Sequence, residues 1–183
     1  ILYRGQEPPQ ESLFIDESNY TYYVFQQRRK LQPLVIDTTS QPHSGLGVDV
    51  YTQATSPLRR YSDLLAQRQM RAALFEESPP YSETQLKELS LIIQKTLRDI
   101  EAMKRNQIRY WILKHLANRI NEHFSALVFQ KLRSKYLVVL PDFLFVGELP
   151  ITSGLDLSPG EEIGVVVKRS DPWDELLVLE PSH

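Results

Sequence analysis

Two adjacent arginines, Arg59 and Arg60, directly follow a Thr-Ser-Pro-Leu sequence at residues 55–58. The hydroxyl groups of Thr55 and Ser56, with a proline after them, are typical of the start of a helix. The first turn of a helix presents unpaired backbone N–H groups and a partial positive charge, and such an end binds phosphate. Guanidinium groups add donors that match phosphate oxygens in pairs. The segment therefore predicts a phosphate-binding site.

The same arginines also allow a purely structural interpretation. Positive side chains are disfavoured at a helix N-terminus, so two of them there run against the local rule, and such violations are typical of functional sites. Asp63, however, lies three residues after Arg60 and four after Arg59, and a helix brings residues at these spacings together. From the residues alone, a phosphate site and a pair of internally neutralised arginines both stay open.

Hydrophobic spacing predicts the helices that would position this segment. Apolar residues at helical spacing predict a helix over residues 55–75, and another is expected over residues 18–31. Residues 82–120 are also helix-rich, and Ser82 with Gln85 fits a capping box. At 1.5 Å per residue an unbroken helix there would be about 58 Å long. A break in it is therefore possible, and the pattern does not locate one.

The character of the sequence changes after residue 120. Five short β-type runs, separated by turn residues, span residues 124–129, 136–140, 143–149, 163–167 and 176–179. Five short strands in about 60 residues suit a small Greek-key barrel of the OB type. We therefore predict an α+β chain, with a helix-rich part over residues 1–120 and a five-stranded OB-type β-barrel over residues 121–183. The boundary is expected near Asn118 to Asn121.

Bulk composition narrows the classes of protein that fit. No apolar run approaches the roughly 18 residues that a membrane helix needs. The 183 residues include no cysteine, which fits a reducing compartment, so we expect a cytoplasmic protein, with an organelle as the alternative. The formal net charge is −2, yet residues 51–120 carry 12 basic and 7 acidic side chains, which weakly favours a polyanionic partner. Because the chain begins with Ile1 and not Met, we expect a piece of a longer protein.

The segment from Ala54 to Leu64, followed by Arg68, resembles the signature of the ribonuclease II/R (RNB) family. That signature reads Thr-Ser-Pro, an aliphatic residue, Arg, Arg or Lys, Tyr, any residue and Asp. Other parts of the chain are similar to the family's pattern upstream of the signature: Tyr3-Arg4, Glu7-Pro8, Gly47 and Tyr51. The long helical region and the terminal barrel lie where the family has its late helices and an RNA-binding OB domain. The resemblance thus extends over nearly the whole chain.

This resemblance implies a processive 3′→5′ exoribonuclease. Such enzymes hydrolyse single-stranded RNA from its 3′ end and release nucleoside 5′-monophosphates, with two Mg²⁺ ions held by aspartates. Arg59 would be the catalytic residue, because the first arginine of the signature contacts the scissile phosphate and stabilises its developing charge. The residues expected near the RNA path with lesser roles are Tyr51, Thr55, Ser56 and Arg60. Asp63 is expected to orient an arginine and not to bind metal.

The sequence departs from the family's pattern in three places. Gln67-Arg68 stands where the family often has His-Arg. If Trp111 is aligned with a tryptophan common in ribonuclease II, Arg105 takes the place of a glutamate that lines the RNA channel. The family's aspartate cluster lies upstream of this region, and the aspartates here show no metal-ligand spacing. These isolated aspartates are Asp37, Asp49 and Asp63.

We therefore expect the Mg²⁺ ligands in the upstream part of the same catalytic domain. That part would be a partner of this chain beside single-stranded RNA, and no membrane partner is expected. The chain alone should be inactive. The alternative is a catalytically inactive RNB relative that acts as an RNA-binding or scaffold module. A close run of aspartates upstream would favour the enzyme over this alternative.

The barrel combines basic and aromatic residues as OB folds do when they stack bases and follow phosphates. The predicted RNA contacts are Lys131, Arg133, Lys135 and Tyr136, with Phe129, Phe143 and Phe145 close by. Strand alternation nevertheless requires some of these aromatics to fill the interior. Residues 121–183 carry 5 basic and 10 acidic side chains, so any RNA contact would be local, and a protein partner stays open. The four histidines form no metal-binding pattern, and His43 is expected in a loop.

Overall fold

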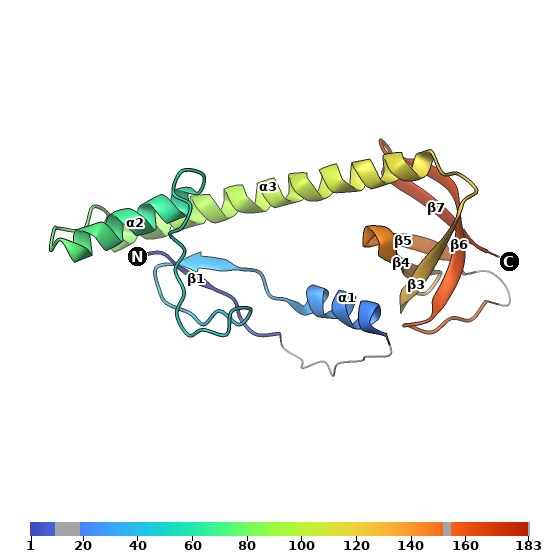
Figure 1. Cartoon of the computed structure of the whole chain (residues 1–183), viewed down its shortest axis with the longest axis horizontal. Helices are drawn as coiled ribbons and strands as arrows, with labels where there is room; N and C mark the ends of the chain where they lie inside the picture. The colour runs from blue at the N-terminus through green and yellow to red at the C-terminus, as the bar shows by residue number, and fades with distance from the viewer. Residues whose placement is uncertain (10–18, 152–154, 183) are drawn as a thin grey trace. The chain divides into compact units, whose positions relative to one another are not determined.

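The computed structural model describes residues 1–9, 19–151 and 155–182, and Figure 1 shows the course of the chain. The chain divides into two compact units, Ile1–Ser12 with Arg28–Glu101 and Leu13–Gln27 with Ala102–His183. Each unit has a hydrophobic core of its own. Among the described residues, no helix combines the length and the apolar character needed to cross a membrane.

The first unit packs a small sheet against helices. β1 (Tyr3–Gly5) pairs antiparallel with β2 (Val35–Asp37), and α2 (Tyr61–Leu74) and the start of α3 (Glu83–Ala117) belong to the same unit. Its buried core residues are Leu2, Ile36, Leu65 and Leu86. The Arg4 N–H donates to the Tyr51 carbonyl at 2.8 Å, and Thr52 Oγ1 donates to the Leu2 carbonyl at 2.6 Å. The first strand is thereby bonded to the segment that leads into the two arginines.

The helix after the two arginines begins later than predicted. α2 starts at Tyr61, with Arg60 as its N-cap residue, whereas the sequence pattern predicted a start at residues 55–57. The predicted hydroxyl cap is wrong as well, because no side chain caps the first turn of α2. Arg60 has an extended backbone, with φ −127° and ψ 111°, and this residue separates the helix from what precedes it.

Residues 57–59 form a separate turn in front of α2. The N–H groups of Arg59 and Arg60 both donate to the Ser56 carbonyl, at 3.3 and 3.0 Å. The N–H of Ser56 donates to Oδ2 of Asp63 at 3.0 Å. Because Asp63 lies in the first turn of α2, its carboxylate ties the preceding turn to the helix.

α3 runs unbroken from Glu83 to Ala117, and no glycine or proline lies within it. The predicted capping box is confirmed at its start. The Ser82 N–H donates to Gln85 Oε1 at 2.8 Å, and the Gln85 N–H donates to Ser82 Oγ at 3.2 Å. Leu86 near the first end enters the core of the first unit, and Leu116 near the other end enters the core of the second.

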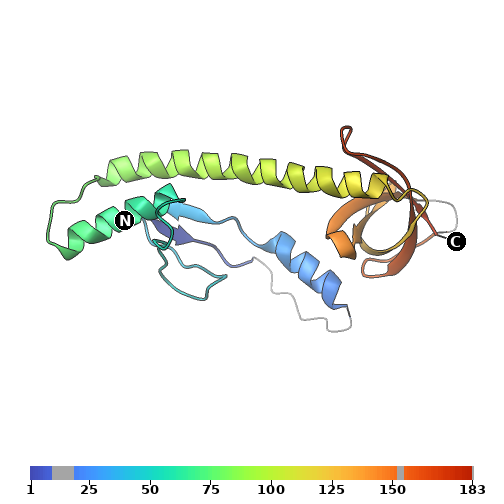
Figure 2. The same ribbon diagram turned by 45° about the horizontal axis from the view of Figure 1, so that its top comes forward.

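The second unit is built on a five-stranded antiparallel barrel, which confirms the predicted α+β fold class. Its strands are β3 (His123–Lys131), β4 (Lys135–Leu140), β5 (Phe145–Pro150), β6 (Glu162–Asp171) and β7 (Leu176–Pro181), and η1 (Pro141–Phe143) joins β4 to β5. The order in the sheet is β5-β4-β3-β6-β7, and Figure 2 shows the strands curling round. All five predicted β-type runs are strands.

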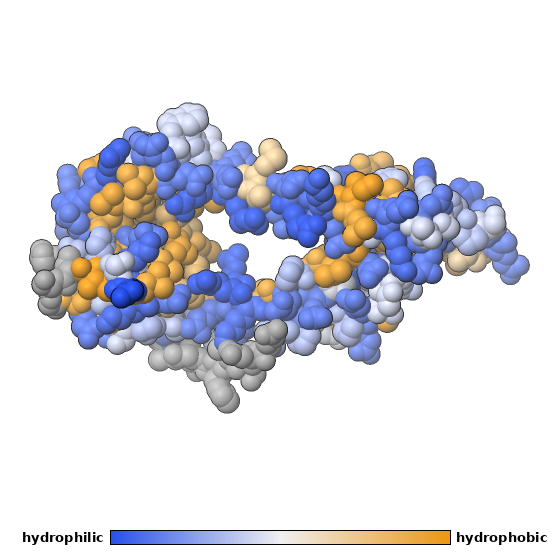
Figure 3. All heavy atoms as spheres, turned by 180° about the vertical axis from the view of Figure 1, so that it is seen from behind, coloured by the Kyte–Doolittle hydropathy of each residue, from blue (hydrophilic) through white to orange (hydrophobic). Residues whose placement is uncertain are grey.

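The two edge strands of this sheet, β5 and β7, approach each other and nearly close the barrel. A Cβ atom built on Gly147 of β5 would come within 2.9 Å of Leu179 Cδ1 and 3.4 Å of Leu177 Cδ2 on β7. A larger residue at position 147 would therefore require the side chain of Leu179 to shift. The barrel end of the chain shows large hydrophobic areas on its surface, on the left of Figure 3.

A short helix, α1 (Tyr20–Lys30), lies where the sequence predicted one. Asn19 caps it, since Asn19 Oδ1 accepts the Tyr22 N–H at 3.3 Å and Asn19 Nδ2 donates to the Gly160 carbonyl at 2.5 Å. The rings of Tyr22 and Phe25 contact Phe129 of β3, with centroid distances of 6.0 and 5.3 Å. These aromatic residues therefore pack against the barrel.

Candidate functional site

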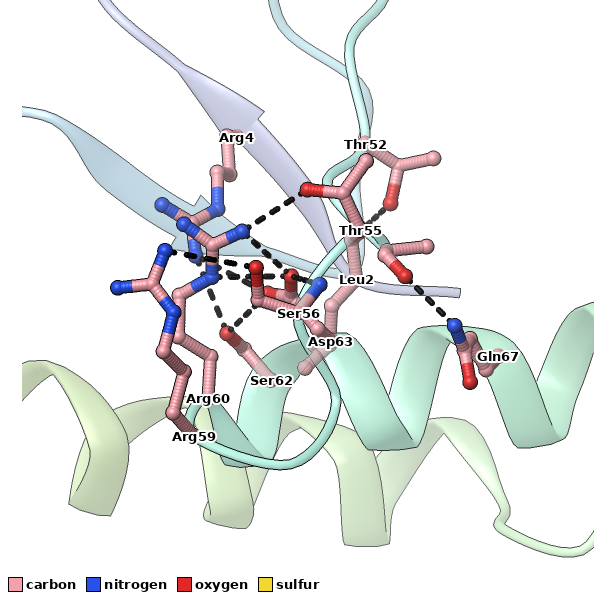
Figure 4. A network of polar contacts seen from close by, with 11 residues as sticks. Leu2, Arg4, Thr52, Thr55, Ser56, Arg59, Arg60, Ser62, Asp63 and Gln67 are labelled. Carbon is pink, nitrogen blue, oxygen red and sulfur yellow. Dashed lines mark hydrogen bonds and ion pairs between the residues drawn. The ribbon is translucent and has the colours of Figure 1, made fainter.

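The signature segment is organised around one buried carboxylate, that of Asp63. Figure 4 shows the polar network around it. Oδ2 accepts hydrogen bonds from Arg60 Nε at 2.9 Å and from the Ser56 N–H at 3.0 Å. Oδ1 accepts from Ser62 Oγ at 3.2 Å and lies 3.5 Å from Arg4 Nη2, which also donates to Ser62 Oγ at 3.1 Å. Asp63 therefore orients arginines, as predicted.

Full burial of Asp63 is tolerated because its charge is compensated. The side chain is 0% exposed, and an unpaired carboxylate in such a place would be very unfavourable. The two guanidinium groups and two further donors replace the hydrogen bonds and charge stabilisation that water gives to an exposed carboxylate. Burial lowers the pKa of Arg4, the positive charge of Arg60 acts in the same direction, and the charge of Asp63 opposes them. Arginine nonetheless stays protonated in proteins, so the ion pairs persist.

The two adjacent arginines have different environments. Arg60 is partly buried and held on both sides, by Asp63 and by Thr55, whose Oγ1 accepts from Arg60 Nη2 at 3.0 Å. Arg59 is exposed, and its Nη2 lies 3.5 Å from Ser56 Oγ. Within the described part of the chain, no carboxylate forms an ion pair with Arg59. The structural interpretation of the sequence therefore applies to Arg60 and not to Arg59.

Tyr51 leads into this network from the side of the loop. Its ring meets His43 edge to face, with centroids 5.4 Å apart and an interplanar angle of 89°. His43 is only 8% exposed, and among the described residues its Nδ1 has no hydrogen-bond partner. The loop that holds it closes through the His43 N–H, which donates to the Val48 carbonyl at 2.8 Å. His43 therefore packs against the signature segment and fixes the position of the tyrosine ring.

The sequence alone did not identify Arg4 as part of this network. Arg4 lies 58 residues before Ser62, and only the pairing of β1 with β2 and the hydrogen bond to residue 51 bring it there. The guanidinium groups of Arg4 and Arg60 lie at the Asp63 carboxylate, and that of Arg59 is exposed beside Ser56. The network therefore carries more positive than negative charge. Its exposed arginine lies at the surface, where the guanidinium group can bind an anion such as a phosphate.

No metal site is present among the residues that the structure describes. They contain no group of three or more His, Cys, Asp or Glu side chains that could hold an ion, whereas Mg²⁺ prefers several oxygen ligands. Asp37 accepts a hydrogen bond from the N–H of Thr38 at 2.6 Å, and Asp63 is occupied by arginines. The described residues therefore do not fit a magnesium centre, and no catalytic step is assigned to a metal held by them.

The basic residues predicted to contact RNA in the barrel differ in whether they already form an ion pair with an acidic side chain. Lys131 pairs with Asp156 at 2.6 Å, and Lys135 pairs with Glu148 at 2.6 Å. The hydrogen bond and charge of Asp156 raise the pKa of Lys131, and the reverse interaction lowers the pKa of Asp156. Arg133, in the turn between β3 and β4, is exposed and has no ion pair among the described residues.

Tyr136 is a core residue, and this contradicts its predicted RNA contact. The side chain is 0% exposed in the barrel interior. Its hydroxyl donates to the Leu155 carbonyl at 3.1 Å and accepts the Leu157 N–H at 3.2 Å. Since Tyr136, Val138 and Leu140 alternate with outward-facing residues on β4, the strand pattern directs the tyrosine ring inward, where it has no free face for a base.

The phenylalanines near these residues also serve packing. Phe129 contacts α1, and Phe143 contacts Phe124 with centroids 5.9 Å apart. Phe145 is buried, and the guanidinium of Arg109 lies 4.9 Å from its ring centroid. The structure thus places Phe143 against the barrel core, whereas Phe129 packs on α1.

Comparison with known proteins places the signature segment in a family. Residues 9–76 match the RNB domain family. An uncharacterized ribonuclease of Synechocystis is 33% identical over 157 residues, which cover 84% of this chain and 23% of that protein. The chloroplastic/mitochondrial ribonuclease II of Arabidopsis thaliana is 27% identical over 141 residues, covering 75% of this chain and 17% of that protein. The chain therefore spans about a quarter or less of these curated relatives.

Solved structures agree with this comparison at the level of the fold. The RNase R of Mycoplasma genitalium superimposes with a TM-score of 0.80 in its apo form and 0.79 in complex with ribose-methylated single-stranded RNA. In both cases the match covers 91% of this chain and 30% of that protein, at 20% sequence identity. The helices and the five-stranded barrel of this chain thus share the fold of the corresponding region of an RNase R.

Proposed function

We propose, because this chain belongs to the ribonuclease II/R (RNB) family, that it is the C-terminal portion of a processive 3′→5′ exoribonuclease. Residues 1–120 would complete the catalytic domain, and residues 121–183 would be an OB-fold domain that binds RNA. The complete enzyme would hydrolyse single-stranded RNA to nucleoside 5′-monophosphates, in RNA degradation and processing. The upstream part of the same catalytic domain is the second partner of this chain.

The observation that carries this proposal is the exposed guanidinium of Arg59, which forms no ion pair with a carboxylate of the described residues. When a phosphodiester is cleaved, negative charge grows on the phosphate oxygens. A guanidinium fixed beside them stabilises that charge more in the transition state than in the ground state, which is what accelerates a reaction. Arg60 lacks this freedom because Asp63 holds it. Arg59 is therefore the residue to which we assign catalysis.

The neighbours of Arg59 have supporting roles in this proposal. Ser56 accepts from two backbone N–H groups through its carbonyl and lies closest to the Arg59 guanidinium, so it fixes the turn that presents the arginine. Thr55 and Asp63 hold Arg60 in place. Tyr51, supported by His43, stands at the entry to the network. We assign Tyr51, Thr55, Ser56 and Arg60 to the RNA path, as binding and positioning residues.

The Mg²⁺ that the family implies would be held outside the described residues. Its ligands are expected among aspartates of the upstream part of the domain, and when bound it would activate the attacking water. The surface of α3 fits the presence of such a neighbour. Exposed large apolar residues on it are Leu91, Ile92, Met103 and Ile108. Exposed apolar side chains of this size are typical of surface that another part of the protein covers.

In the barrel, the proposal assigns the RNA contact chiefly to Arg133. Lys131 and Lys135 would add phosphate contacts only if RNA displaced Asp156 and Glu148, and both ion pairs are exposed and therefore weak. Because residues 121–183 carry more acidic than basic side chains, these contacts position RNA locally and do not attract it from a distance.

The proposal is tested by replacing Arg59 in the complete enzyme. Arg59→Ala should lower kcat on single-stranded RNA about 10²- to 10³-fold, the usual effect of losing one charge-stabilising donor, and should weaken RNA binding much less. Arg59→Lys should recover only part of the rate, because an ammonium group lacks the paired donors of guanidinium. Turnover is measured on 5′-labelled RNA, which distinguishes stepwise shortening from the 3′ end from internal cutting.

Arg71→Ala is the matched control, since it removes an exposed guanidinium from the last turn of α2, the helix that follows Arg59 in the sequence. It should leave kcat unchanged. Equal losses of kcat and of RNA affinity in Arg59→Ala would reduce Arg59 to a binding contact. RNA binding without any hydrolysis by the unmodified enzyme, with Mg²⁺ supplied, would favour the inactive RNA-binding or scaffold relative.

A further inference from the structure

Three aromatic side chains meet on the surface of the second unit, away from the signature segment in the sequence. Tyr110 and Trp111 lie on α3, and Trp173 lies at the tip of the hairpin between β6 and β7. The Tyr110 ring contacts both indoles edge to face, with centroid distances of 5.5 Å to Trp111 and 5.4 Å to Trp173. Figures 1 and 2 both show this hairpin reaching α3. We call these three residues the aromatic platform.

The hairpin is held to α3 by specific polar contacts. Arg109 Nη2 donates to the Glu175 carbonyl at 3.0 Å, and Arg109 Nε lies 3.3 Å from Glu175 Oε2. The tip is rigid because Asp171 Oδ1 accepts the N–H groups of Trp173 and Asp174, at 3.0 and 3.2 Å. The position of the Trp173 ring is therefore determined by the fold and not by a free loop.

Burial does not explain why these rings are together. Trp173 is 84% exposed and Trp111 is 56% exposed, so their large apolar faces meet solvent and not a core. Folding gains little from an indole in such a place, since hydrophobic stabilisation follows the apolar area removed from water. Two open indole faces braced by a third ring are, by contrast, well suited to stack on a planar ligand.

A cation completes the platform. Lys114 Nζ lies 4.9 Å from the centroid of Trp111 and 5.8 Å from that of Tyr110, and no carboxylate among the described residues forms an ion pair with it. Arg109 stands on the same helix. A nucleotide combines a planar base with a negatively charged phosphate. Here the base would meet an aromatic face on which to stack, and the phosphate would meet a positive charge.

We propose that the aromatic platform stacks an unpaired base of single-stranded RNA, with Lys114 contacting a neighbouring phosphate. This inference rests on the proposed function, because RNA is the ligand that it supplies. The β6–β7 connection is also one of the loops through which OB folds contact oligonucleotides. Of the aromatics that the sequence suggested for stacking, Tyr136 and Phe145 are buried, whereas the two indole rings of the platform are exposed.

The test uses the two tryptophans themselves. The chain has only two, and both belong to the platform, so its tryptophan fluorescence reports on this site alone. Addition of a single-stranded oligoribonucleotide should quench that fluorescence in parallel with the anisotropy increase of a fluorescein-labelled copy of the same RNA. The quenching should persist at raised salt for as long as RNA stays bound, because stacking depends on ionic strength much less than phosphate contacts do.

Variants then measure the contribution of each ring. Trp173→Ala should weaken RNA binding about 5- to 150-fold, the range that corresponds to the loss of one stacked base, and Trp173→Phe should recover part of it. Phe75→Ala is the matched control. Phe75 is 68% exposed and has the guanidinium of Arg71 5.9 Å from its ring centroid, but belongs to no group of rings. Its replacement should leave RNA affinity unchanged.

The possible failures are distinguishable. RNA binding seen by anisotropy with no change in tryptophan fluorescence and no effect of Trp173→Ala would overturn the platform and leave the proposed function intact. No RNA binding by either measurement, at low salt, would remove RNA as the ligand and so contradict both. A protein partner for the platform would then be the remaining interpretation of the exposed indoles.

Discussion

At Asp63, one buried carboxylate accepts hydrogen bonds from the Ser56 N–H, Arg60 and Ser62 and forms an ion pair with Arg4. Its removal would leave two partly buried guanidinium groups without a counter-charge. Asp63→Ala should therefore destabilise the chain by about 3–5 kcal/mol, the cost of removing one partner from a buried ion pair. Asp63→Asn keeps the shape and one acceptor, so it should cost less. Urea unfolding followed by far-UV circular dichroism measures both.

Glu83→Gln is the control for this series. It removes the ion pair between Glu83 and Lys87, whose carboxylate and ammonium groups are both exposed, and should hardly move the unfolding midpoint. If Asp63→Ala and Glu83→Gln changed stability equally little, Asp63 would not be the centre of the network.

Individual residues show which side-chain contacts can be predicted from neighbouring positions in the sequence. The pairing of Asp63 with an arginine followed from its spacing, but the choice of Arg60 over Arg59 did not, because both spacings suit a helix. The structure decides between them by starting α2 at Tyr61, after the arginines. Tyr136 was predictable, since it is in phase with Val138 and Leu140 on one face of β4.

At the scale of elements, the capping box of α3 offers a direct test. Gln85 N–H donates to Ser82 Oγ, so Ser82→Ala leaves that N–H without its partner in the first turn. The first turn should lose about 0.5–2 kcal/mol, and the Gln85 amide should exchange its hydrogen correspondingly faster. Amide hydrogen exchange resolved by NMR measures this.

Thr96→Ala serves as the control in the same helix. The Thr96 hydroxyl donates to the Ile92 carbonyl, well inside α3, and caps no terminus. Its replacement should leave the exchange of the Gln85 amide unchanged. Protection of that amide in Ser82→Ala as strong as in the unmodified chain would show that tertiary packing, and not the cap, holds the start of α3.

Elements were predictable where their boundaries are marked by local chemistry. Turn residues separate the five strands, and the capping box marks the start of α3. The continuity of α3 was also readable, since glycine and proline are absent from it. The start of α2 was not, because Thr55, Ser56 and Pro57 have the residue types of a helix start, while the Ser56 N–H and the Thr55 hydroxyl bond to Asp63 and Arg60.

At the scale of the whole molecule, the sequence did not predict which segments far apart in the chain pair with one another. β3 pairs with β6 across an intervening hairpin, and Arg4 reaches the signature segment through β1. The aromatic platform joins residues of α3 to Trp173, more than sixty positions later, so Trp111 looked like one more apolar helix residue and Asp171-Pro172 like an ordinary turn. No local pattern reports that two such segments will meet.

The two separate cores lead to a prediction for the chain as a whole. Leu149 belongs to the barrel core and Leu65 to the core of the first unit, and both are 0% exposed. Truncating either leucine to alanine should cost its own unit about 2–5 kcal/mol. Because the two sites share no core, the effect should stay within the unit that contains the substitution.

Tryptophan fluorescence distinguishes the units, since both tryptophans lie in the second one. In a urea titration, Leu149→Ala should shift the fluorescence midpoint to lower urea, whereas Leu65→Ala should leave it in place and shift only the circular dichroism signal of the first unit. Val128→Ala, also in the barrel core, should behave like Leu149→Ala with a smaller shift, because fewer carbon atoms are removed. An equal fluorescence shift in Leu65→Ala would mean that α3 couples the two cores into one cooperative unit.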